Sequence, residues 1–188
     1  MRLMLRFTLA LAVLSVALSS STAKAQASIY GTVSESAFAY SDYDGDANFN
    51  GYNPGFGGGL TYVFVHRAVN VGVDVRDTYT PNKNGGNTAA ASIRLGFVPP
   101  PYPCHPYFQI GPGIISAKSY DGSNTSKTYN SGAVALAWGL DVRVAPNLDI
   151  RAIEISIMVG GNNSNASAEG SFSAGVVYHF HSAKTQKS

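Results

Sequence analysis

The chain has 188 residues, of which 13% are charged and 45% hydrophobic, and its formal net charge at pH 7 is only +2. It contains no basic run of the kind that binds nucleic acid, and beyond the N-terminal segment no apolar run approaches the ~20 residues that a membrane helix requires. Its single cysteine, Cys104, cannot form a disulfide within the chain. Composition therefore leaves a soluble domain and a membrane β-barrel as alternatives.

The first segment, residues 1–25, has the pattern of a secretory signal peptide. Arg2 and Arg6 form a positive n-region, and residues 7–18 form an apolar h-region that is too short to cross a bilayer. A small-x-small cleavage site follows at 23–25. We therefore predict that this segment is removed on export and takes no part in the fold.

After this segment, apolar and polar side chains alternate with a period of two, which is typical of strands. The clearest run is 133–144, where Val134, Trp138 and Val144 share one face and Asp141 and Arg143 share the other. Turn signals between such runs give eight predicted strands, at 28–40, 55–65, 69–80, 88–98, 106–120, 131–144, 148–160 and 168–180. The pattern predicts an all-β fold, an eight-stranded antiparallel up-and-down barrel.

Two of these strands are irregular. In 106–120, Pro112 lies between two glycines, and because proline has no N–H to donate, we expect a bulge or kink there. In 148–160, Arg151 and Glu154 can share a face only if a bulge forms at Ala152 and Ile153.

The predicted connections alternate in length. They are tight or Pro-rich after the second, fourth and sixth strands, and longer and polar after the first, third, fifth and seventh, over 41–54, 81–87, 121–130 and 161–167. This layout is typical of outer-membrane barrels, which have short periplasmic turns and long external loops. A soluble sandwich has no reason to separate its loops in this way.

One face of the predicted strands is apolar and the other carries Gly, Ser and charged residues. In a soluble barrel the apolar face would fill the interior, but all eight predicted strands exceed the ~5–6 residues usual in globular sheets and reach the ~9–11 that cross a bilayer. We therefore expect the apolar face to point outward. Two aromatic girdles are predicted, Phe64, Phe97, Phe108, Tyr178 and Phe180 at the short-turn end, and Phe38, Tyr40, Tyr79, Tyr120 and Tyr129 at the long-loop end.

The last predicted strand carries the most specific signal. Ser173 and Gly175 precede two aromatic residues, Tyr178 and Phe180, that are separated by one residue. This strand resembles the terminal strand that the outer-membrane assembly machinery recognises, and these four residues are its candidate recognition positions. With the strand pattern, the chain resembles the small eight-stranded outer-membrane barrels of the OmpA/OmpX or opacity type, a porin-like family.

The resemblance implies a location in the bacterial outer membrane after signal-peptide cleavage, with a barrel over 26–180 and a short periplasmic tail over 181–188. The tail is a departure, because the recognition strand is expected to end the chain. The implied partners are outer-membrane lipid, lipopolysaccharide and the assembly machinery. The loops are rich in Asn, Ser and Gly and contain no anchor cluster that would identify a partner at the cell surface.

The charged residues of the polar face should converge inside such a barrel. They are Asp74, Arg76, Arg94, Asp141, Arg143, Arg151 and Glu154, four positive and three negative. Eight strands leave a lumen just wide enough for side chains, and an unpaired buried charge costs several kcal/mol. We therefore predict an ion-pair plug in which Arg143 compensates Asp141 or Glu154. A narrow ion or solute path is the alternative.

No pattern predicts catalysis, a metal site or a cofactor. The four histidines, His66, His105, His179 and His181, fall near the predicted periplasmic end, whereas a hydrolase of lipid A needs a serine, a histidine and a carboxylate at the outer leaflet. Neither Cys104 with His105 nor the histidine pair at 179 and 181 completes a set of metal ligands.

We therefore predict a non-enzymatic outer-membrane protein whose external loops serve envelope structure, adhesion or another surface interaction. A narrow channel for ions or small solutes is the first alternative. A soluble, ligand-binding barrel of the periplasm is the second.

Overall fold

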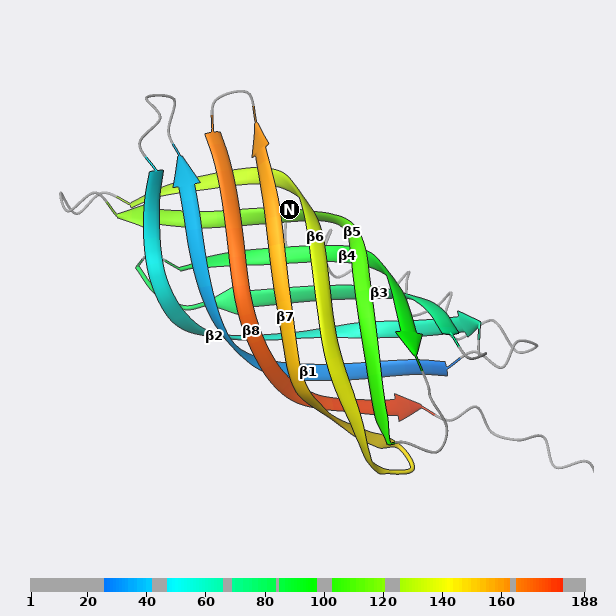
Figure 1. Cartoon of the computed structure of the whole chain (residues 1–188). Helices are drawn as coiled ribbons and strands as arrows, with labels where there is room; N and C mark the ends of the chain where they lie inside the picture. The colour runs from blue at the N-terminus through cyan, green and yellow to red at the C-terminus, as the bar shows by residue number, and fades with distance from the viewer. Residues whose placement is uncertain are drawn as a thin grey trace, which may run out of the picture.

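Eight antiparallel strands form a closed barrel in the computed structural model, which describes residues 26–41, 47–65, 69–83, 85–97, 103–120, 126–162 and 165–180. Each strand pairs with its neighbours in sequence, and β8 pairs with β1 to close the barrel (Figure 1). The strands are β1 (Gln26–Ser41), β2 (Ala47–Val65), β3 (Val69–Thr80), β4 (Gly86–Phe97), β5 (Cys104–Tyr120), β6 (Ser126–Ala145), β7 (Leu148–Asn162) and β8 (Asn165–Phe180). The predicted fold class and all eight strands are confirmed. The predicted signal peptide and tail lie outside the described residues.

The barrel is apolar outside and polar inside. Val33, Val134 and Val176 are 50% to 68% exposed, whereas Asp74 and Arg151 are completely buried. A strand alternates its side chains between two faces, so this distribution fixes the apolar row of each strand on the outer wall. The predicted outward face is therefore confirmed. The arrangement contradicts the soluble periplasmic barrel, whose interior would hold the apolar side chains.

The barrel has two rims. The proximal rim contains the first residue of β1, the last residue of β8 and the connections at 66–68, 98–103 and 146–147; the distal rim contains the connections at 42–46, 81–85, 121–125 and 163–164. Figure 1 shows the distal ends of β1, β2, β7 and β8 side by side at one end, with the β6–β7 turn at the other.

The predicted lengths of the distal loops are wrong. The distal connections span 42–46, 81–85, 121–125 and 163–164 and are shorter than predicted, because residues assigned to long loops continue the strands instead. β1 and β2 remain paired up to Ser41 and Ala47, and β5 and β6 up to Tyr120 and Ser126. Thr128 is exposed on the outer face of this continuation, so β6 extends past the apolar band with a polar outer surface at this position.

The proximal aromatic girdle is present as predicted. All five of its rings point outward and are 36% to 49% exposed, namely Phe64, Phe97, Phe108, Tyr178 and Phe180. Tyr178 and Phe180 contact each other edge to face, with ring centroids 5.2 Å apart. The side chain of Tyr120, predicted for the distal girdle, lies outside the described residues.

The distal girdle is only partly as predicted. Tyr79 points outward and packs edge to face on Phe56, with ring centroids 5.6 Å apart. Phe38 and Tyr40 point into the barrel instead, because both occupy inward positions of β1 and are 1% and 7% exposed. Tyr40 stacks on Tyr129 of β6, although two strands separate β1 from β6. These inward rings help to fill the distal half of the lumen.

A small apolar cluster also lies inside the distal half. It consists of Phe38, Ala90, Ile115, Ala117, Ala135 and Met158. Sequence analysis did not predict it, because all inward rows were expected to be polar or small.

The two predicted irregularities have different outcomes. The register of β7 against β8 shifts between Arg151 and Glu154, which confirms the bulge that brings both side chains inward. No register shift occurs at Pro112, so the expected bulge is absent. Pro112 stays paired with Val134 of β6, while pairing with β4 is interrupted there, where Gly111 lets the β4 backbone approach closely.

The outward orientation of β8 predicts a strong effect of charge on its outer face. Val176→Arg should destabilise the barrel in lipid vesicles by about 2–4 kcal/mol, the cost of an arginine at the bilayer midplane. Thr128→Arg, on the polar continuation of β6, is the matched control and should change stability by less than about 1 kcal/mol. Reversible urea unfolding in vesicles measures both. Equal losses would contradict the position of the apolar band.

Candidate functional site

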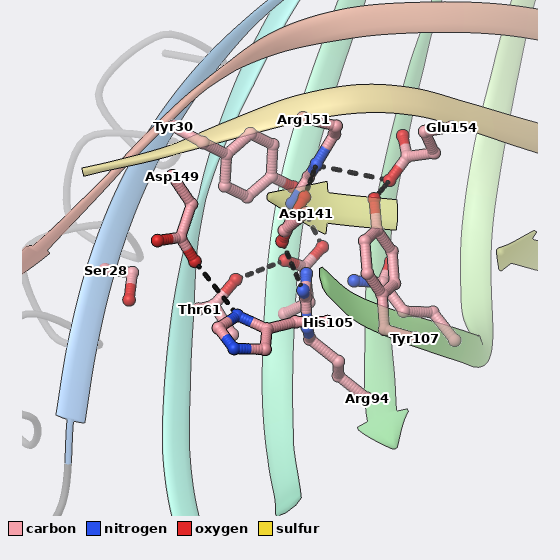
Figure 2. A network of polar contacts seen from close by, with 12 residues as sticks. Ser28, Tyr30, Thr61, Arg94, His105, Tyr107, Asp141, Asp149, Arg151 and Glu154 are labelled. Atoms are coloured by element: carbon pink, nitrogen blue, oxygen red, sulfur yellow. Dashed lines mark hydrogen bonds and ion pairs between the residues drawn. The ribbon is translucent and has the colours of Figure 1, made fainter. Parts of the chain in front are cut away.

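The lumen holds a continuous network of buried charges centred on Arg151. Its side chain is completely buried, with Nε donating to Asp141 at 3.0 Å and Nη1 to Glu154 at 3.2 Å. Figure 2 shows Arg151 between these two carboxylates. Arg94 of β4 donates to the other oxygen of Asp141 at 2.6 Å. The β7 bulge is required for this arrangement, because it places the arginine and Glu154 on the same face.

Arg76 connects this centre to β3. Its Nη1 donates to Glu154 at 2.7 Å and its Nε to Asp74 at 3.1 Å, and its Nη2 donates to Gln109. Asp74 also accepts a hydrogen bond from Thr61 of β2, at 2.7 Å. Glu154 therefore joins two arginines that come from opposite sides of the network.

Two tyrosines complete the network. Tyr30 donates to Asp74 at 2.9 Å and Tyr107 to Glu154 at 2.6 Å. The guanidinium of Arg151 lies over both rings, with Cζ 4.2 Å and 4.9 Å from their centroids, and that of Arg94 lies 3.6 Å from the ring of Tyr107. Because cations are attracted to aromatic faces, the rings hold the guanidinium groups in place as well as binding the carboxylates.

Each tyrosine ring lies over a glycine on the neighbouring strand. Tyr30 is paired with Gly59 of β2, and Tyr107 with Gly139 of β6. A Cβ at either glycine would overlap the tyrosine hydroxyl. These two glycines therefore leave the space that lets the rings lie flat against the wall and reach the acids.

A second group of polar residues lies at the proximal rim. Asp149 of β7 is 2% exposed and contacts Arg143 Nε at 3.3 Å, His179 Nε2 at 2.9 Å and His105 Nδ1 at 3.4 Å. The Ser28 hydroxyl lies 2.7 Å from Nδ1 of His179. Figure 2 places Asp149 and His105 beside the central network.

The charges of the two groups balance. The structure pairs four arginines with four acids. Sequence analysis identified seven of these eight residues and missed one acid, Asp149. It is the inward neighbour of Arg151 two positions along β7, so the period of two could have identified it. Arg143 contacts Asp149 and is 45% exposed, which contradicts the expectation that it compensates Asp141 or Glu154. Arg151 contacts both of those acids instead.

Sequence analysis missed further partners because they are uncharged. Tyr30, Thr61, Tyr107 and Gln109 contribute hydrogen bonds to the acids or arginines of the network. All four lie at inward positions by the alternation of their strands. Neutral hydrogen-bonding residues are common on polar strand faces, so the pattern alone did not distinguish them.

The rim contains a serine, a histidine and an aspartate within hydrogen-bond reach, a combination that sequence analysis had not expected. The three side chains are inward neighbours on β1, β8 and β7. Ser28 is only 4% exposed, and the group lies inside the proximal rim. A hydrolase that acts on a lipid needs its serine at the lipid face, and this group does not meet that requirement.

Between the charge network and the apolar cluster lies a cavity of about 20 Å³. Arg76, Gln109 and Glu154 form part of its lining on one side, and Ala135 and Met158 on the other. Since a buried water requires ~10–15 Å³, the cavity is of water size. At this level, among the residues that the structure describes, side chains therefore occupy the lumen and leave only this small space.

The four candidate recognition residues all lie on β8. Tyr178 and Phe180 point outward and are 44% and 49% exposed. Ser173 and Gly175 occupy inward positions, and the Ser173 hydroxyl donates to Glu154 at 3.3 Å. β8 is also one of the two strands that close the barrel, by pairing with β1.

The network predicts that replacing its different arginines by alanine lowers the stability of the barrel by different amounts. Arg151→Ala leaves Asp141 and Glu154 buried with weaker compensation and should destabilise the barrel by about 3–5 kcal/mol. Arg143→Ala removes an ion pair at a half-exposed position and should cost less than about 1 kcal/mol. Urea unfolding in the same vesicles measures both changes. The account is contradicted if Arg143 proves the more costly of the two to remove.

Comparisons with solved structures agree with this fold. Ail, the attachment invasion locus protein of Yersinia pestis, is 19% identical, with 84% of this chain and 99% of that chain covered and a TM-score of 0.55. Ail in complex with the heparin analogue sucrose octasulfate is 20% identical over the same shares, with a TM-score of 0.52. Neisserial surface protein A is 16% identical, with 81% and 97% covered and a TM-score of 0.51.

No curated protein sequence matches the chain. The family of the outer membrane protein beta-barrel domain matches residues 8–180, which include every strand of the barrel. The match agrees with the apolar outer wall and the closed eight-stranded sheet. This chain therefore belongs to the outer membrane protein beta-barrel domain family.

Proposed function

We propose that the protein is a closed, non-enzymatic barrel of the bacterial outer membrane that presents its distal rim to the exterior for envelope structure, adhesion or another surface interaction. The observation that carries the proposal is the filled lumen. Four arginines and four acids pair with each other in the proximal half, and the cluster around Phe38 fills part of the distal half. A barrel closed in this way can act only through its outer wall and its rims.

The distal rim is the end proposed to face outward. The strands extend beyond the apolar band at this end, and their outer surface there is polar at Thr128 and Asn130. An even number of strands, as in outer-membrane barrels, puts Gln26 at the start of β1 and Phe180 at the end of β8 on the same rim, and this proximal rim is the one proposed to face the periplasm. The names of Ail and Neisserial surface protein A, an attachment protein and a surface protein, fit the proposed class.

A narrow channel is the second candidate. Hydroxyl groups of Thr32, Ser34 and Thr88 line the cavity beside Arg76, as they would in a polar path. Passage would require both the charge network and the apolar cluster to open. Because the network pairs buried charges with each other, opening it would expose several ionised groups at once. We therefore favour the closed barrel.

We predict that the distal rim reacts with reagents outside intact cells. In a Cys104→Ser background, Thr128→Cys should react with a membrane-impermeant maleimide without permeabilisation. Native Cys104, at the start of β5 on the proximal rim, should react only after permeabilisation. The reverse pattern would invert the orientation.

The same proposal predicts that the purified wild-type protein gives no large, resolved conductance steps in planar bilayers. Arg143→Ala, at the rim, should leave this result unchanged. Large steps whose ion preference changes in Arg143→Ala would establish the channel instead.

The end of β8 is proposed as the segment that the assembly machinery reads. Phe180→Asp places a charge in the proximal girdle and alters this strand, so the compact, heat-modifiable species seen on gels should fall sharply in cells. Deletion of residues 181–188 should be tolerated. If the deletion is the more damaging change, the recognition segment extends beyond Phe180.

A further inference from the structure

A β-bulge in the distal part of β2 brings two aromatic rings onto the outer wall. Ser36 of β1 pairs with Asn53, but Phe38 pairs with Asn50, so two residues of β2 oppose one of β1. Phe49 and Tyr52 are three positions apart and would point to opposite faces of a regular strand. With the bulge both point outward, 66% and 61% exposed, and their rings meet edge to face with centroids 6.3 Å apart.

The bulge is held by a buried amide. Asn53 is 8% exposed, and its Nδ2 donates to the carbonyl oxygen of Gly51 at 2.8 Å. Asn82, beyond the end of β3, donates in turn to Oδ1 of Asn53. The two exposed rings are therefore fixed by hydrogen bonds on the inner side of the wall.

The rings lie above the apolar band. Phe64 belongs to the proximal girdle, and Phe56, eight positions earlier on β2, packs on Tyr79 at the distal edge of the apolar face. With a rise of ~3.3 Å per residue and a tilt of ~40°, these two levels are about 20 Å apart, close to the ~25 Å height of the apolar band. The same geometry places Tyr52 about 10 Å and Phe49 about 15 Å farther from the membrane centre than Phe56.

At that depth, outside the hydrocarbon, the wall of an outer-membrane barrel is surrounded by the sugars of the outer-leaflet glycolipid. We propose that Phe49 and Tyr52 form a docking surface for the core sugar rings of lipopolysaccharide. The apolar C–H face of a sugar ring can stack on an exposed aromatic ring, removing apolar surface of both from water. This surface continues the lipid-facing wall beyond Phe56 and Tyr79. A lipopolysaccharide molecule that covers the wall at Phe56 and Tyr79 therefore also reaches Phe49 and Tyr52.

The charge beside this surface favours neutral sugars over phosphate. Glu35, paired with Pro54 of β2, is exposed on the same outer wall just below Tyr52. A carboxylate at this place repels the phosphate groups of the glycolipid. The rings themselves carry no charge, so recognition rests on stacking. The proposal depends on the distal rim facing outward, but it concerns the outer wall and not the lumen.

The test compares lipopolysaccharide that carries core sugars with lipid A that lacks them, each titrated into the purified barrel in detergent. The wild type should bind the core-bearing form more tightly, by about tenfold, a difference of ~1.4 kcal/mol. Phe49→Ala with Tyr52→Ala should remove this preference and leave lipid A affinity unchanged. Phe64→Ala with Phe97→Ala, which removes two outward rings at the proximal rim, should keep it.

Asn53→Ala tests whether binding requires the arrangement of the two rings and not only their presence. It retains both rings but removes the amide that holds the bulge, so it should reduce the preference while the heat-modifiable gel species shows an intact barrel. The proposal is overturned if the wild type shows no preference, if the double alanine variant keeps it, or if that variant loses both ligands equally. A wild-type dimer that dissociates in the double variant would identify a second copy as the occupant instead.

These binding measurements use purified protein and do not depend on orientation in the cell. If the preference is absent while Thr128→Cys is still labelled in intact cells, the sugar surface fails and the proposed surface function remains. If the preference is present while the labelling is reversed, the orientation fails, and with it the docking of lipopolysaccharide in the cell, because the rings would then face away from the outer leaflet.

Discussion

The structure depends on one constraint, that charges buried in a narrow lumen must neutralise each other. Arg151 is completely buried and is held between Asp141 and Glu154, each of which binds a second arginine. An isolated ion at this position would lose several kcal/mol of hydration without replacement. The balance of four arginines and four acids offsets part of that penalty, and the tyrosine hydroxyls and ring faces provide further contacts. The wall can then be apolar outside because the charges of this network are paired inside.

This interior also limits what the molecule can do. The charge network lies in the proximal half and the apolar cluster in the distal half, and the cavity between them is of water size. The closed interior supports the proposal that the protein acts through its outer wall and its distal rim. There the strands continue past the apolar band, and the bulge of β2 presents Phe49 and Tyr52 beside it.

The fold was predictable because the period of two is strict in the membrane-spanning rows. It separated the apolar face from the polar face, strand length then assigned the apolar face to the outside, and the period required the bulge between Arg151 and Glu154. The partners of the charges were less predictable, because alternation gives the face of a side chain and not its depth or its neighbour across the barrel. Arg143 was therefore given the wrong acid, and Asp149 was missed. Loop lengths failed for a related reason, since polar residues beyond the apolar band continue to pair as strands. Phe38 and Tyr40 were placed outward by their aromatic character, although the alternation of β1 places them inside.

The most direct test of the account is a double-mutant cycle between Arg151 and Asp141, measured by reversible unfolding in lipid vesicles. If the lumen is held by mutual neutralisation, removing both side chains should cost less than the sum of the single changes, with a coupling of at least about 1 kcal/mol. Costs that add within about 0.3–0.5 kcal/mol would show that the two groups do not compensate each other. That result would contradict the account of the closed lumen.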